Sequence, residues 1–175
     1  IFDLLCLPRT HYAKLNIHVG ASYGDKSKAI DNFCRNVDRL SDAVRSRLTV
    51  ENDDRASLYS TLDLMEVYKR VGTPIVHDLH HHTFCTGGLS NPDALALAVS
   101  TWGTTTPVVH YSQSRATEYN DTSIKAHAHS DSYWTPVDTY GHDVDVMLES
   151  KSKEQSLFKM RELLGKDKFG NDLEK

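Results

Sequence analysis

The sequence predicts an α/β fold of parallel strands, of the (β/α) TIM-barrel type. One observation is the order of elements, because strand-like apolar runs alternate with segments of helical periodicity in five successive units, and such units give parallel strands with right-handed crossovers. The other is that each strand ends in a possible metal ligand, on the face that carries the active site of a barrel. These strand-end residues are His18, Glu51, Asp78, His110 and Glu149.

An open doubly wound sheet is the alternative arrangement of such units. It would gather its site at a single switch point, so a ligand at the end of every strand favours the barrel. A complete barrel needs about 250 residues, and this chain has 175. We therefore expect about three units of the barrel to be missing from the sequence.

The first unit begins with residues 14–20, where apolar and polar residues alternate as in a strand. Ser22 or Asp25 is expected to cap the helix that follows. Apolar residues then recur at helical spacing over 29–44, which predicts an amphipathic helix about five turns long.

The second unit pairs a strand over 48–50 with a helix over 61–70, which Gly72 is expected to end. The third begins with the strand over 74–78. Its helix is expected to start with Asn91 as the N-cap.

The fourth strand is predicted over 106–111, and a polar segment over 112–143 follows it. A connection of this length is typically functional or disordered. The fifth strand covers 144–148, and its helix covers 152–164 with Leu164 on the buried side. We expect residues 1–165 to form one partial-barrel domain and 166–175 a charged tail.

Composition narrows the class of protein. No apolar run reaches the ~20 residues of a membrane span, so no membrane association is expected. Three scattered cysteines suggest a reducing, intracellular compartment, without separating cytoplasm from nucleus. The net charge of −4 does not indicate bulk electrostatic binding of nucleic acid, yet bound divalent ions would invert the local field.

The segment from Asp78 to His82 carries the strongest metal signal. Asp78 and His81 stand three residues apart, so a turning backbone can direct both at one cation. Carboxylate with imidazole suits Zn, Mn or Fe better than Ca. The alternative for this segment is a solvated polar loop. Likewise, His18 alone could be a hydrogen-bonded core histidine, and Glu149 could cap the helix that follows it. These alternatives do not explain why every strand ends in the same way.

The whole candidate set exceeds the needs of one ion. Two or three ions that share carboxylates fit it better, with Glu51 and Glu149 as the bridges. Such clusters catalyse hydrolytic displacement at phosphorus. The candidate ligands are His18, Glu51, Asp78, His81, His110, His129 and Glu149, with His127 in reserve.

Seven short motifs, in this order, resemble the UV damage endonuclease family over about residues 14 to 160. Each is weak alone, but the ordered set is specific. The motifs are NIHVG at 16–20, YGDK at 23–26, VEND at 50–53, DLHHH at 78–82, HYS at 110–112, HSD at 129–131 and MLESKSKE at 147–154.

The resemblance implies a metal-dependent endonuclease that cuts DNA on the 5′ side of UV photoproducts, on a barrel related to endonuclease IV. It implies up to three ions, with manganese favoured and zinc, cobalt or magnesium possible. Six candidate ligands fall on the family's ligand positions, and His129 is the best match for a seventh, with His127 the other possibility. Glu51, Asp78 and Glu149 are the expected catalytic carboxylates. The five strands would be strands 4 to 8 of the barrel.

Two departures from the family pattern are visible. Val108 stands where some members carry a lysine thought to be carboxylated. The family's first three strands, with two further histidine ligands and a Gln-Tyr pair that enters the duplex, have no counterpart in this sequence. A partial barrel, or a second chain that completes it, is therefore expected.

Damaged double-stranded DNA is the expected partner. Lys26, Lys151 and Lys153 are the expected phosphate contacts. Two other functions stay open: a sugar or sugar-phosphate isomerase of the related barrel group, and a truncated, non-catalytic fragment.

Overall fold

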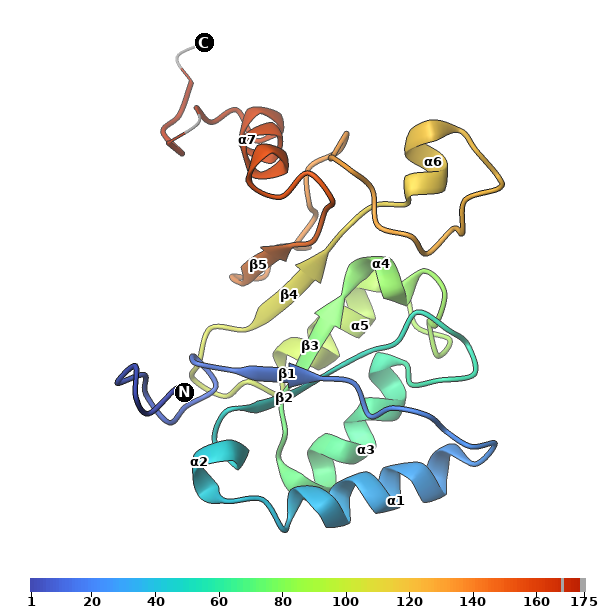
Figure 1. Cartoon of the computed structure of the whole chain (residues 1–175), viewed down its shortest axis with the longest axis vertical. Helices are drawn as coiled ribbons and strands as arrows, with labels where there is room; N and C mark the ends of the chain where they lie inside the picture. The colour runs from blue at the N-terminus through green and yellow to red at the C-terminus, as the bar shows by residue number, and fades with distance from the viewer. Residues whose placement is uncertain (168, 174–175) are drawn as a thin grey trace.

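The computed structural model describes residues 1–167 and 169–173 and contains one five-stranded parallel sheet. The strands are adjacent in chain order, β1-β2-β3-β4-β5, as the repeated strand–helix units predict. The sheet curls like part of a barrel wall, with β1 and β5 as its two edges (Figure 1). The strands are β1 Leu15–Ile17, β2 Leu48–Glu51, β3 Ile75–Asp78, β4 Val108–Tyr111 and β5 Asp145–Leu148.

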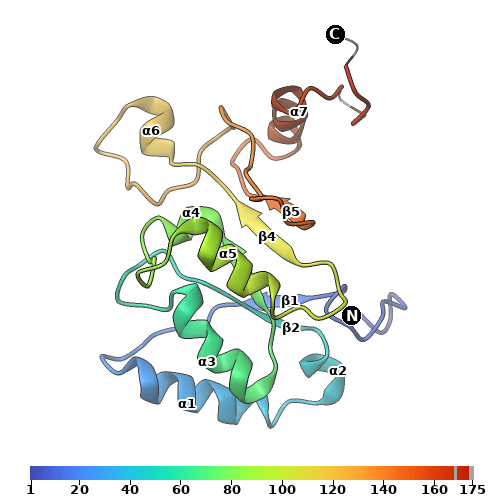
Figure 2. The ribbon, with the colours of Figure 1, turned by 180° about the vertical axis from the view of Figure 1, so that it is seen from behind.

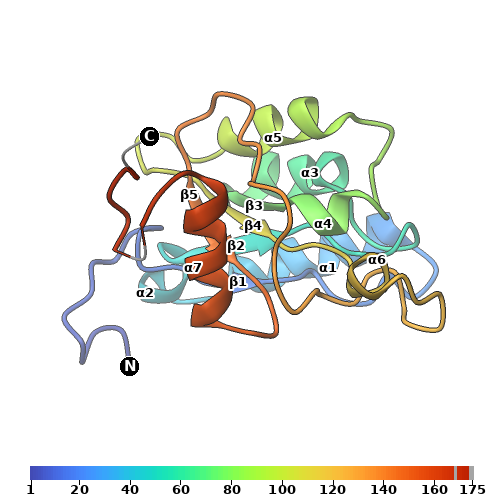
Figure 3. The ribbon, with the colours of Figure 1, turned by 90° about the horizontal axis from the view of Figure 1, so that it is seen from above.

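The longer helices cover the convex face of the sheet. Figure 2 shows α1, α3 and α5 side by side, and α3 contacts both of the other two. Figure 3 shows α7 beside β5. Figure 1 shows α1 at the opposite end of the molecule from α7. The helices are α1 Lys26–Val37, α2 Asp42–Arg45, α3 Thr61–Val71, α4 Leu79–His82, α5 Asn91–Val99, α6 Arg115–Tyr119 and α7 Glu154–Leu163.

The five-turn helix predicted over 29–44 is wrong in length. Helix α1 ends at Val37, and the separate helix α2 begins after Ser41. Asp38 and Ser41 favour caps and turns over helix interiors, and Leu40 stays 39 % exposed, so no packing compensates. Asp25 is the N-cap of α1, since its side chain accepts from the Lys28 N–H.

Two further expectations are corrected. Ser90, not Asn91, is the N-cap of α5, because its hydroxyl accepts from the Asp93 N–H while Asn91 is already helical. Leu164 is exposed, since α7 ends at Leu163 and the buried side of that helix is formed by Ser156 and Met160. Gly72 ends α3 in the left-handed conformation, as predicted.

Alternation along each strand separates two environments. Val50 and Ile75 point to the convex side and pack with α1 and α3, while Val109 packs in a second cluster with α5 and α7. On the concave side, residues from β1, β4 and β5 line a hollow of about 610 Å³, including Asn16 and His110. The functional candidates therefore gather on the concave face, at the carboxyl ends of the strands.

The N-terminal segment is attached to the sheet through Arg47. This arginine is only 2 % exposed, and its guanidinium donates to three main-chain carbonyls and to the Asp3 carboxylate. All three cysteines are free, with Cys34 and Cys85 buried. Among the described residues, no helix has both the length and the apolar character needed to cross a membrane.

Candidate metal centre

Three strands each deliver one ligand-type side chain to the same place. Glu51, Asp78 and His110 end or nearly end β2, β3 and β4, and the parallel register aligns Asp78 with His110. All three are buried. Because side chains alternate along a strand, His77 points the other way and bonds to Thr61 among the helices.

Carboxylates and imidazoles alternate in a row across the carboxyl ends of the strands. Glu51 is the pivot, since its two oxygens face different histidines. Glu149 repeats the arrangement one step further along. The distances are 3.3 Å from Glu51 Oε1 to His81 Nδ1, 3.3 Å from Glu51 Oε2 to His110 Nδ1, 3.1 Å from His110 Nδ1 to Glu149 Oε1 and 3.6 Å from Glu149 Oε2 to His129 Nδ1.

The two carboxylate oxygens of Asp78 have different roles, since one caps a helix and the other faces the candidate ligands. Oδ1 accepts the N–H groups of His80 and His81 and so caps the short helix α4. Oδ2 lies 3.7 Å from His81 Nδ1 and has no hydrogen-bond partner among the described residues. A fully buried carboxylate oxygen without a partner is costly, which favours a cation at this position.

The electrostatics show how closely these groups are coupled. Burial by itself lowers the pKa of His110, but the Glu149 and Glu51 carboxylates outweigh it and raise the pKa to about 10. Burial also lowers the pKa of His81, but the Glu51 and Asp78 carboxylates outweigh burial and raise that pKa to about 9. Without metal, both imidazoles are therefore protonated at neutral pH.

The pKa values of the three carboxylates shift in different directions. Burial raises the pKa of Glu51, but His110 and His81 outweigh burial and hold that pKa well below the usual glutamate value. Its contact with His110 lowers the pKa of Glu149. Burial raises the pKa of Asp78 above the usual aspartate value. A divalent cation would remove this penalty by supplying the missing positive charge.

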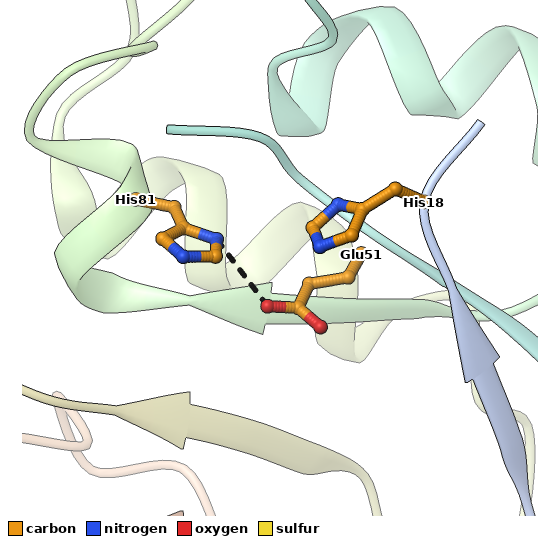
Figure 4. Close-up of side chains that lie close together, drawn as sticks. All are labelled: His18, Glu51 and His81. Carbon is orange, nitrogen blue, oxygen red and sulfur yellow. Dashed lines mark ion pairs between the residues drawn. The ribbon is translucent and has the colours of Figure 1, made fainter. Parts of the chain in front are cut away.

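Two groups of side chains could each hold a metal ion, and they share Glu51. One consists of His18, Glu51 and His81, shown in Figure 4, and the other of Glu51, Asp78 and His110; in each, the ligand atoms lie within 4.8 Å of one another. Nδ1 of His110 has carboxylates on two sides but no hydrogen-bond partner among the described residues. Ligand atoms that converge without hydrogen bonds to one another are what a metal ion requires, so these residues fit a metal centre.

The family follows from the sequence match over nearly the whole chain. The sequence model of the family described as UV-endonuclease UvdE matches residues 1–172 of this chain. The chain belongs to the UV-endonuclease UvdE family.

Relatives in bacteria and yeast agree with the UvdE assignment. A UV DNA damage endonuclease of Bacillus cereus (strain B4264) is 33 % identical over 172 residues, which cover 91 % of this chain and 50 % of the relative. A UV-damage endonuclease of Schizosaccharomyces pombe is 36 % identical over 157 residues, 85 % of this chain and 25 % of the relative. The chain thus spans half or less of the length of these two relatives.

A solved structure of the same kind settles the fold class. The crystal structure of SacUVDE matches with a TM-score of 0.77 and 28 % identity, over 93 % of this chain and 53 % of the other. The prediction of a partial TIM-type barrel is thereby confirmed, and the five strands form about half of the UvdE barrel.

The remaining predicted ligands lie at the rim of the candidate metal centre. The side chain of His18 is 42 % exposed, and its Nδ1 lies 3.3 Å from the buried Asp53 carboxylate. His129 reaches the row through Glu149. His127 lies 4.0 Å from Asp54, outside the two possible metal groups.

The other histidines of the 78–82 motif have separate surroundings. His82 is buried, with its Nε2 hydrogen-bonded to the Leu89 carbonyl. His80 is buried beside His129 and Phe84. Burial and His129 lower the pKa of His80 to about 4. Neither residue belongs to the possible metal groups among the described residues.

The three predicted DNA-contact lysines are divided between two regions. Lys151 and Lys153 line a hollow of about 430 Å³ together with His129 and Glu149, next to the metal centre. Lys26 lies in the first turn of α1, with its Nζ 3.0 Å from Asp63 Oδ2. The structure therefore brings only Lys151 and Lys153 to the centre.

Two asparagines support the site and were missed in the sequence. Asn16 donates to Glu51 Oε2 at 2.5 Å and accepts from Thr49 Oγ1. Asn52 bonds to the main chain of Asp78. Asn16 carried a usable signal, because it stands two residues before His18 and so shares its side of the strand.

Proposed function

We propose that this chain carries the metal centre of a UV-damage endonuclease, which hydrolyses the phosphodiester bond on the 5′ side of a photoproduct in double-stranded DNA. The observation that carries the proposal is the row of alternating imidazoles and carboxylates pivoted on Glu51. Family membership supports the substrate class. The whole reaction remains a proposal because the chain spans half or less of its relatives.

The proposed ligands are the seven sequence candidates, holding two or three divalent ions with manganese favoured. Such ions supply an activated water and stabilise the attacking and leaving oxygens of the phosphate. Glu51, Asp78 and Glu149 are the proposed catalytic carboxylates. Glu51 would face two ions at once, and Asp78 would use its free Oδ2, while Oδ1 keeps α4 in place.

The proposed DNA contacts lie beside this row. Lys151 and Lys153 adjoin Glu149 in the 430 Å³ hollow, where their ammonium groups can neutralise phosphates that flank the cut bond. Lys26 is proposed as a more distant contact at the start of α1. Damage weakens base pairing, so the free energy needed to unstack a nucleotide is lowest at the lesion. This difference supplies selectivity without base-specific contacts.

Incision of an end-labelled duplex with one defined photoproduct tests the proposal, with Mn²⁺ present and an undamaged duplex beside it. Asp78→Asn is the informative variant, because an amide can still cap α4 with one oxygen but brings no charge to the site. Asp93→Asn is its matched control, since Asp93 is a first-turn aspartate of α5 outside the possible metal groups. The proposal expects a cut 5′ to the lesion that only Asp78→Asn abolishes.

Two other outcomes would contradict parts of the proposal. Metal binding without incision would indicate a non-catalytic chain. It would direct attention to β1 and β5, the edge strands of the described sheet, where further strands could complete the barrel. Incision that Asp78→Asn leaves intact would place the chemistry elsewhere.

The lysine assignment has a separate test in DNA affinity. Replacing Lys151 and Lys153 by alanine should lower the slope of log affinity against log salt by about 2, close to one per phosphate contact. Lys159→Ala is the matched control, because Lys159 lies on α7 and pairs with Glu162. An unchanged slope in the double variant would remove these contacts from the proposal.

A further inference from the structure

Asn52 links two neighbouring strands where their regular pairing stops. The last register pair between β2 and β3 is Glu51 with Val76. Beyond it, the Asn52 side chain spans to β3, because Nδ2 donates to the Asp78 carbonyl at 3.0 Å and Oδ1 accepts from the Asp78 N–H at 2.7 Å. The amide thus makes the two bonds that a paired peptide group would make, and Asn52 is completely buried.

The main chain of Asn52 contacts a second candidate ligand. Its carbonyl lies 3.0 Å from Nδ1 of His81, on the helix α4 that Asp78 caps. A histidine that binds metal through one ring nitrogen characteristically donates the N–H of its other ring nitrogen to a fixed acceptor, which sets the orientation of the ring. This contact therefore leaves Nε2 of His81 available for a cation. One buried residue therefore contacts both the backbone that carries Asp78 and the ring of His81.

We propose that Asn52 is a positioning residue of the metal centre, which holds Asp78 Oδ2 and the His81 ring in place for cations. The inference rests on the proposed metal centre. Asp78 Oδ1 is already bonded to two N–H groups of α4, so the direction of Oδ2 depends on where the Asp78 backbone is held. Without the Asn52 amide, Asp78 at the end of β3 loses the two hydrogen bonds that hold its main chain to the residue after β2.

Thr101 provides a matched comparison at the opposite end of the same strand. Its hydroxyl accepts from the N–H of Ile75, the first residue of β3, at 2.9 Å, and donates to Ala98 at 2.6 Å. Thr101 is also buried. Both side chains bond to the β3 backbone, but only Asn52 does so beside the ligands.

The experiment is calorimetric titration of the full chain with Mn²⁺, together with the melting temperature of each metal-free variant. Asn52→Ala is expected to weaken Mn²⁺ binding at least about tenfold, as loss of outer-shell partners typically does. Thr101→Val is expected to bind Mn²⁺ like the wild type, although both variants lose buried hydrogen bonds and melt at lower temperature. A purely structural role would lower only the melting temperature.

Asn52→Ser serves where the alanine variant does not fold, because its hydroxyl keeps the cavity polar but is too short to span both Asp78 groups. The same weakening of about tenfold or more is expected. Wild-type affinity in a folded Asn52 variant would overturn the inference alone. Absence of Mn²⁺ binding in the wild type would overturn the proposed metal centre and this inference together.

Discussion

Filling the metal centre at pH 7 is expected to release about two protons, one from His81 and one from His110. Although burial lowers both pKa values, the carboxylates beside these rings raise them to about 9 and about 10. Both rings are therefore protonated at pH 7 in the metal-free protein. Only neutral imidazole binds metal, so each ion must displace the proton of the histidine in its own group.

The pH dependence follows from the same values. The two histidines belong to different possible metal groups, so the affinity of each ion should rise about tenfold per pH unit. The rise should stop near pH 9 for the group with His81 and near pH 10 for the group with His110.

Calorimetry with Mn²⁺ in two buffers of different ionisation enthalpy measures the released protons. His110→Ala should release about one proton in place of two, because one proton accompanies each ligated histidine. His142→Ala is the control, since His142 lies before β5 and outside the possible metal groups. Binding of Mn²⁺ at pH 7 without proton release would refute the reasoning.

Three further predictions concern stability and metal content. In chelator, the melting temperature should fall as pH rises from about 6.5 to about 9 to 10. The folded pKa values of His81 and His110 lie above the unfolded value of about 6.5, so the stabilisation by these groups is complete below the unfolded value and is lost by the time pH reaches the folded values. A flat profile would contradict this. Glu51→Gln should abolish metal binding at both possible metal groups, because they share this carboxylate. The measurement is the metal content of the variant after gel filtration, and one equivalent of metal remaining bound would contradict the prediction. Arg47→Met should lower the free energy of unfolding by about 3 kcal/mol in denaturant titration, since it leaves three main-chain carbonyls without their charged donor; a loss within experimental error would mean that water replaces the guanidinium.

Much of the fold could be predicted from the sequence because its signals are local. Each strand was recognised from a short apolar run, and the parallel order followed from the alternation with helices. The length of α1 could not be predicted in this way, because residues 38–44 continue the apolar spacing of the helix. The helix ends because Asp38 and Ser41 favour caps and turns, and Leu40, which is 39 % exposed, adds too little burial to outweigh them.

For the candidate site, the sequence determined which residue types end each strand. Polar residues that could bind metal follow apolar runs at Glu51, Asp78 and His110, and parallel strands bring their carboxyl ends to one edge. Alternation within a strand also separates His77 from Asp78 without any knowledge of the fold. These inferences need only the period of a strand and the direction of the chain.

The tertiary structure decided which of these groups meet. Glu51 faces both His81 and His110 only because β4 and the short helix α4, which follows Asp78 and contacts β3 and β4, bring the two rings to the end of β2. The fold also leaves His127, on the loop between α6 and β5, outside the possible metal groups among the described residues and places the Asn52 amide against the main chain of Asp78. Distances of this kind depend on register and curvature summed over several strands, and no local pattern in the sequence records that sum.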